Sequence, residues 1–230
     1  MDTFKELRQS KTRISFNLNN KLMLVHSFIL AKRLIKLQDH LGAARLLIRV
    51  SNNISQFPSN VANILTSTVA ECVKSGLKEA AFNWSCVLAR PEHRNNIPEA
   101  FKKRVMNIAR HPVTEQDGPD NVTPCPYCRF EIPDYLLDCP KCKNFLPFCV
   151  ASGKHMTLQS WSQCPECKLP CRYESMRKVL ENDPTCPMCN KVVPPDNLRI
   201  SSDPEADFKT LTALMKDSGP EQDDQADDGH

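Results

Sequence analysis

Four short motifs of the form Cys-Pro-x-Cys carry most of the chemistry that this sequence offers. They are CPYC at 125, CPKC at 139, CPEC at 164 and CPMC at 186. A Cys-x-x-Cys turn holds two thiolates at the separation that one tetrahedral ion needs, and proline at the second position favours the turn. No βαβ pattern surrounds any of them, which argues against a thioredoxin-type redox role. The motifs therefore predict metal sites.

The simplest pairing of the motifs is sequential, because two neighbouring turns close a four-sulfur site. Zinc is the expected ion, since all-thiolate tetrahedral sites suit it. Four protein ligands leave no open coordination position, so we predict two structural zinc ions and no catalytic residues. The predicted ligands are Cys125, Cys128, Cys139 and Cys142 for the first site, and Cys164, Cys167, Cys186 and Cys189 for the second.

A second pairing is also open. Cys149 and His155, in FCVASGKHM, are additional candidate ligands. A RING-like cross-brace would join the 139 and 164 motifs at one ion, and Cys149, His155 and the 186 motif at the other. This order leaves Cys125 and Cys128 without a metal, so we rank it second. Cys171 has no partner in either scheme.

Composition limits the classes of protein that remain. The chain has 230 residues, a net charge of +3 and twelve cysteines, ten of them between 125 and 189. Residues 201–230 hold nine acids and two bases, which leaves +10 on residues 1–200. Eight thiolates and two Zn²⁺ would lower that excess to about +6, which weakens a nucleic-acid interpretation. We find no secretion signal, so a reducing compartment and metal-bound cysteines are expected. The most apolar stretch, LMLVHSFILA, is too short to span a bilayer.

The predicted organisation is mainly α-helical with a small zinc-binding end. Apolar periodicity and helix-capping residues predict helices between 17 and 110, with Asp39 as an N-cap, Gly76 as a C-terminal signal and Pro98 at a helix start. We expect five parts: a flexible N-terminus at 1–16, a helical domain at 17–110, a linker at 111–124, a zinc-binding module at 125–198, and a mostly disordered acidic tail at 199–230. RYESMRKVLEN inside the module and FKTLTALMK in the tail are expected to form short helices.

A weak internal repeat places the helices in pairs. At an offset of 36 residues, Leu41 matches Leu77, Ala44 matches Ala80 and Leu46 matches Phe82. This spacing is close to the period of about 34 residues in tetratricopeptide-type helical hairpins. The fold class is therefore predicted as tetratricopeptide-like hairpins, then a zinc-ribbon or RING-like module, then the tail. Two hairpins are fewer than the three repeats a solenoid needs, so they are expected to pack on something else or to end a longer array.

The order of motifs also carries a family resemblance. The segments NNKLMLVHSFILAK, GAARLLIRVSNNISQFPS, ILTSTVAEC, GLKEAAF, ARPEHR, CPYC, CPKCKN, PFCVASGKHM, CPEC and CPMC occur in this order. Together they resemble the C-terminal part of the large WD-repeat and tetratricopeptide-like subunit of intraflagellar transport complex A. The resemblance covers residues 14 to 195 but neither the first dozen residues nor the acidic tail. The family's metal role transfers onto the eight motif cysteines.

The resemblance implies a non-enzymatic scaffold. Its expected partners are other subunits of intraflagellar transport complex A, with ciliary cargo as an indirect partner and neither nucleic acid nor a transmembrane segment. The expected location is the cilium or flagellum, the basal body and the cytoplasm, with a role in retrograde transport and cilium assembly. The family's propellers are missing, so we expect a fragment of a longer protein. The alternatives are a RING-type ubiquitin ligase, which requires the cross-brace, and a nucleic-acid-binding zinc ribbon.

Overall fold

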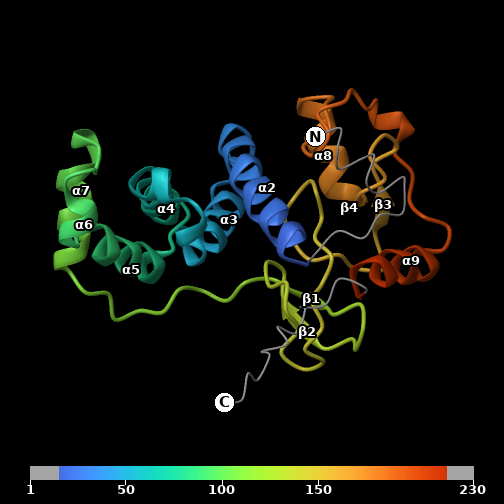
Figure 1. Cartoon of the computed structure of the whole chain (residues 1–230), viewed down its shortest axis with the longest axis horizontal. Coiled ribbons are helices and arrows are strands. Elements are labelled where there is room, and N and C mark those ends of the chain that lie inside the picture. The colour runs from blue at the N-terminus through green and yellow to red at the C-terminus, as the bar shows by residue number, and fades with distance from the viewer. Residues whose placement is uncertain (1–15, 217–230) are drawn as a thin grey trace, which may run out of the picture.

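The computed structural model describes residues 16–216, which form a row of helices leading into a cysteine-rich part (Figure 1). The expected flexible N-terminus and the last part of the acidic tail lie outside the described residues. The helices of the row are α2 (Phe16–Lys36), α3 (His40–Asn52), α4 (Val61–Lys74), α5 (Lys78–Leu88), α6 (Pro91–Arg94) and α7 (Glu99–Arg110). Short 3₁₀ turns, η1 (Ile54–Gln56) and η2 (Pro58–Asn60), connect α3 to α4. The prediction of a mainly helical fold is confirmed.

Local signals set the helix boundaries. The Asp39 carboxylate accepts a hydrogen bond from the Gly42 amide at 2.9 Å, as an N-cap should. Gly76 follows α4 with φ +79°, a left-handed conformation that glycine adopts at little cost. Pro98 precedes the first residue of α7. Sequence reasoning missed the four-residue helix α6.

The helices stack as hairpins. Each of α2, α3, α4 and α5 packs on the next helix of the row, with α7 on α5. Ala44 of α3 packs with Cys72, Leu77 and Ala81 of the following hairpin, so small residues do permit a close approach there. Between residues 16 and 216, no helix combines the length and the apolar character that crossing a bilayer requires.

The segment after α7 is fastened to the helices. Both carboxylate oxygens of Asp117 accept hydrogen bonds from the first amides of α5, those of Glu79 and Ala80, at 2.9 and 3.0 Å. Asp120 forms an ion pair of 2.7 Å with Arg45 of α3. This stretch, predicted as a linker, therefore follows a defined path to the cysteine-rich part.

The cysteine-rich part contains two small antiparallel sheets. Strands β1 (Val122–Pro124) and β2 (Glu131–Pro133) form the first, and β3 (Trp161–Gln163) and β4 (Pro170–Arg172) form the second. Helix α8 (Tyr173–Asn182), turn η3 (Pro195–Asn197) and helix α9 (Pro204–Lys216) complete it. Helix α8 matches the short helix predicted at RYESMRKVLEN, and α9 includes the predicted FKTLTALMK but begins four residues earlier, at Pro204.

Candidate metal centres and the joint between them

The eight motif cysteines form two separate clusters. Within each cluster the sulfur atoms all lie within 4.8 Å of one another. The first cluster holds Cys125, Cys128, Cys139 and Cys142, and the second holds Cys164, Cys167, Cys186 and Cys189. The grouping is sequential, and an interleaved cross-brace is not the arrangement that these cysteines adopt.

The sulfur spacing fits zinc. In the first cluster, the Sγ atoms of Cys125 and Cys142 are 3.9 Å apart, and those of Cys128 and Cys139 are 3.6 Å apart. A tetrahedron with Zn–S bonds of about 2.3 Å has edges of about 3.8 Å. Burial raises the pKa of the Cys125 thiol to about 12, and a bound cation would favour its thiolate form. The chain thus carries two clusters suited to structural zinc.

All four motifs share one backbone turn. The amide of the first cysteine donates to the carbonyl five residues later, and its own carbonyl accepts from the amide four residues later, at 2.9–3.1 Å. The residue after the second cysteine has φ between +57° and +60° in every case. These four residues are Arg129, Lys143, Lys168 and Asn190. We call this turn the knuckle.

A fifth knuckle occurs where no Cys-x-x-Cys motif exists. The Cys149 amide donates to the Lys154 carbonyl at 2.7 Å, and the Gly153 amide donates to the Cys149 carbonyl at 2.8 Å. Gly153 has φ +70°, so it takes the left-handed position. Ser152 stands where the other knuckles have their second cysteine. The fifth knuckle, residues 149–154, therefore offers one sulfur instead of two.

Cys149 and His155 lie outside both clusters and have other partners. The Cys149 sulfur accepts a hydrogen bond from the Arg172 amide at 3.2 Å. His155 is fully buried, and its Nε2 lies 2.8 Å from the Thr123 hydroxyl. Burial, together with the positive charge of Arg172, lowers the pKa of His155 to about 4, so the imidazole is neutral at pH 7.

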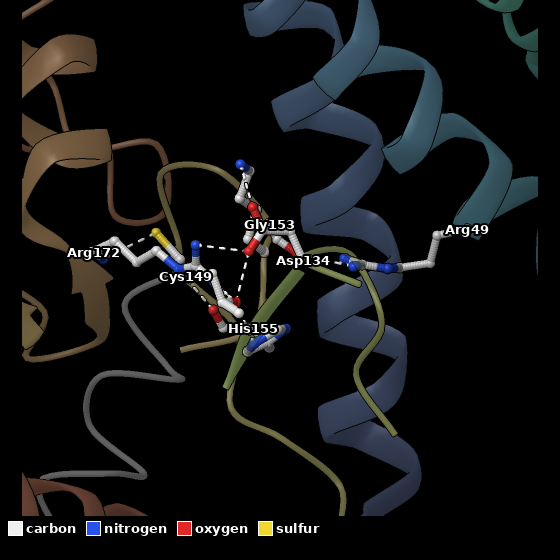
Figure 2. A network of polar contacts seen from close by, with 8 residues as sticks. Arg49, Asp134, Cys149, Gly153, His155 and Arg172 are labelled. Carbon is white, nitrogen blue, oxygen red and sulfur yellow. Dashed lines mark hydrogen bonds and ion pairs between the residues drawn. The ribbon is translucent and has the colours of Figure 1, made fainter. Parts of the chain in front are cut away.

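The fifth knuckle joins the helices to the cysteine-rich part. Arg49 of α3 donates to the carbonyls of Gly153 and Tyr135, at 2.9 and 2.7 Å (Figure 2). His26 of α2 lies with its Nε2 2.9 Å from the Val150 carbonyl. Two helices are therefore held by backbone carbonyls of the knuckle and of the loop after β2.

A buried carboxylate ties the two cysteine clusters together. Asp134 follows β2 in the first unit, and it forms ion pairs with Arg172 at 3.0 Å and Lys154 at 2.7 Å (Figure 2). Burial alone would raise the pKa of Asp134, but Lys154, Arg172 and the Thr123 hydroxyl together hold it below its usual value. Arg172 is the last residue of β4, in the part of the chain that holds the second cluster. The Asp134–Arg172 ion pair therefore links the part that holds the first cluster to the part that holds the second.

Helix α9 adds an aromatic contact between the same units. The ring of Phe208 meets the ring of Tyr127 edge-on, with centroids 4.8 Å apart, and that of Trp161 at 6.0 Å. Tyr127 belongs to the first knuckle and Trp161 to β3. Sequence reasoning identified none of the joint residues Arg49, Asp134, Gly153, Arg172 and Phe208. The only local signal was the spacing of CVASGK, which matches a knuckle once serine is accepted in place of the second cysteine.

The fold and the clusters define a helical-array protein with structural zinc centres. Residues 120–143, which hold the first cluster, match the family model described as "IFT144, first zinc finger domain". The chain is 43% identical over 200 residues to WD repeat-containing protein 19 of Mus musculus and 42% identical over 201 residues to that of Homo sapiens. It is 36% identical over 209 residues to WD repeat-containing protein dyf-2 of Caenorhabditis elegans.

These matches cover helices and cysteine clusters alike. They take in 87% to 89% of this chain, and the chain spans 15% of the length of each of these curated relatives. The resemblance noted in the sequence is thereby confirmed. It rests on segments without metal ligands as well as on the knuckles.

Proposed function

We propose that this chain is a non-enzymatic assembly module that works in intraflagellar transport. Its partners are other subunits of intraflagellar transport complex A, and it acts at the cilium and basal body in retrograde transport and cilium assembly. The observation that carries the proposal is the similarity to WD repeat-containing protein 19 over 87% of the chain, together with the zinc-finger match at residues 120–143.

The proposed role of the metal is structural. Each cluster supplies four thiolates, so a bound zinc ion would have no position left for water or substrate and would serve as a cross-link. We assign the first ion to Cys125, Cys128, Cys139 and Cys142, and the second to Cys164, Cys167, Cys186 and Cys189. Structural zinc contributes about 10–16 kcal/mol to the folding of small domains, which suits a unit with only three-residue strands.

The proposed mechanism is the presentation of a rigid surface. The ion pair between Asp134 and Arg172 connects the parts of the chain that hold the two clusters. The hydrogen bonds of Arg49 connect these parts to the helical row. A partner that contacts both parts would meet a surface whose geometry is already set, which lowers the ordering cost of binding.

The test is recovery of partners from ciliated cells. The tagged chain would be expressed and immunoprecipitated, with complex A subunits quantified by mass spectrometry against a tag-only control. A Cys164→Ser variant tests whether the zinc centres are needed, and a Cys86→Ser variant serves as control because Cys86 lies on α5, far from the clusters. Enrichment of complex A subunits that is lost only with Cys164→Ser is expected. Recovery of no subunit above the tag-only control would overturn the proposal.

A further inference from the structure

Helix α2 exposes one line of aliphatic and basic residues. Lys21, Val25, Ile29, Lys32 and Lys36 follow one another at steps of three or four residues, so they lie along one side of the helix. All five are exposed, including 45% of Val25 and 46% of Ile29. We call this line the α2 stripe.

The stripe is positively charged; Asp183 is attracted to Lys36, although these two residues do not form an ion pair. Helix α2 contains four basic residues and no aspartate or glutamate. Within residues 16–216, no carboxylate lies within the 4.0 Å of an ion pair from Lys21, Lys32 or Lys36. Arg33, the fourth base, is already paired with Asp183 at 2.9 Å. Lys21, Lys32 and Lys36 thus have no ion-pair partner among residues 16–216, although the ammonium of Lys32 lies 4.4 Å from the centroid of the Phe28 ring.

The chain itself contains a segment of the opposite charge. Residues 217–230, DSGPEQDDQADDGH, hold six acids and no lysine or arginine. We call this segment the acidic tail end. Its charge is opposite to that of α2, which has lysine and arginine but no aspartate or glutamate.

Helix α9 brings the start of the tail end close to α2. Leu211 of α9 lines the same apolar pocket as Asn19 and Leu22 of α2, together with Phe148 and Met188. Only four residues lie between Leu211 and Lys216, the last residue of α9. The tail end thus leaves the described structure near the N-terminal half of the stripe.

The length of the tail end is sufficient. Fourteen residues span at most about 48 Å at about 3.4 Å each. The stripe, from Lys21 to Lys36, measures about 22 Å at about 1.5 Å per helical residue. At full extension the tail end is therefore about twice as long as the stripe.

We propose that the acidic tail end binds the α2 stripe of the same chain. The aspartates pair with Lys21, Lys32 and Lys36, and the chain then crosses the exposed Val25 and Ile29. This proposal concerns an internal contact and stands independently of the transport function.

Zero-length cross-linking of carboxylates to amines tests the contact directly. The full chain would be treated with a carbodiimide and digested, and cross-linked peptides would be quantified by mass spectrometry. We expect cross-links from the tail end to Lys21, Lys32 or Lys36 that fall at least fivefold in 1 M NaCl, where the screening length is about 3 Å. Lys103 of α7, exposed and at the opposite end of the row in Figure 1, is the control lysine.

Lysine acetylation provides a second measurement that needs no cross-link. Deleting residues 217–230 should raise the acetylation rates of the stripe lysines at least threefold and leave the rate of Lys103 unchanged. Equal cross-linking to Lys103, cross-links confined to lysines of the cysteine units, or unchanged acetylation after the deletion would each overturn the proposal. Zinc content and circular dichroism of the deletion variant verify that the fold is intact.

Discussion

Replacing Gly153 by alanine tests the joint between the helices and the fifth knuckle. A Cβ atom at this position would lie 2.4 Å from Cδ2 of Leu46, and 3.3 and 3.4 Å from Cδ1 and Cγ of the same side chain. Leu46 is completely buried on α3. Carbon atoms pack at about 3.5–4.0 Å, so Leu46 or the whole knuckle must move by about 1 Å or more.

The expected loss of unfolding free energy in Gly153→Ala has a backbone contribution and a packing contribution. A matched change at Gly76 measures the backbone contribution alone. Gly76 has φ +79° but nothing within 4 Å of its Cβ position, so Gly76→Ala carries the backbone term alone, about 1–2 kcal/mol. Gly153, at φ +70°, adds overpacking against a buried side chain, about 1–3 kcal/mol more. We therefore expect Gly153→Ala to reduce the free energy of unfolding by about 2–5 kcal/mol.

Urea denaturation of the zinc-loaded protein, followed by circular dichroism, measures both variants. In the double variant with Leu46→Ala, the added methyl group would enter the space that Leu46 vacates. The two changes should then couple by about 1–3 kcal/mol relative to the sum of the single effects. If Gly153→Ala costs no more than Gly76→Ala, the contact with α3 is not what selects glycine, and the account of the joint fails.

Four further predictions concern the metal, the buried charges and the helices. Cys125→Ser and Cys164→Ser should each remove about one zinc per chain by elemental analysis, whereas Cys149→Ser should remove none. Asp134→Ala should lower the free energy of unfolding in urea by about 3–5 kcal/mol by leaving buried cations unpaired, and Asp134→Asn by less. Burial lowers the pKa of His26 to about 4, below its unfolded value near 6.5, so folding stability should fall with pH from 6.5 downward. His26→Leu should flatten that slope by up to about 1.4 kcal/mol per pH unit between pH 6.5 and 5. Chelation of zinc should abolish hydrogen-exchange protection in the cysteine units and weaken it in α2, which packs on them, while α4 and α5 keep theirs.

The parts that the sequence predicts are those with short-range causes. Helix ends follow from Asp39, Gly76 and Pro98, each of which acts on backbone groups within a few residues. The two cysteine clusters follow equally, because each knuckle is a six-residue unit with its own hydrogen bonds. The sequence favours sequential pairing because the cross-brace leaves Cys125 and Cys128 without a metal, and the structure brings the sulfurs together in sequential order.

The contacts that join the helices to the cysteine-rich part, and the two clusters to each other, are formed by residues far apart in the sequence. Asp134 and Arg172 are 38 residues apart, and Arg49 and Gly153 are 104 residues apart. The sequence around these four residues does not distinguish them from charged residues and glycines that lie on a protein surface. Their residue types and spacing make Cys149 and His155 additional candidate ligands, whereas their environment is set by Arg172 and Thr123 from other segments.

The left-handed residue of each knuckle shows what distinguishes the fifth. Arg129, Lys143, Lys168 and Asn190 adopt φ near +60° with a side chain present, so the knuckle itself does not require glycine. The fifth knuckle has Gly153, the position at which Leu46 of α3 leaves no room for a Cβ atom. Four knuckles thus bring their sulfurs together in two clusters, whereas the fifth has Ser152 in place of a second cysteine and presents its backbone to the helical row. The docking of the helices therefore depends on a turn that has the hydrogen bonds of a knuckle but only one of its two sulfurs.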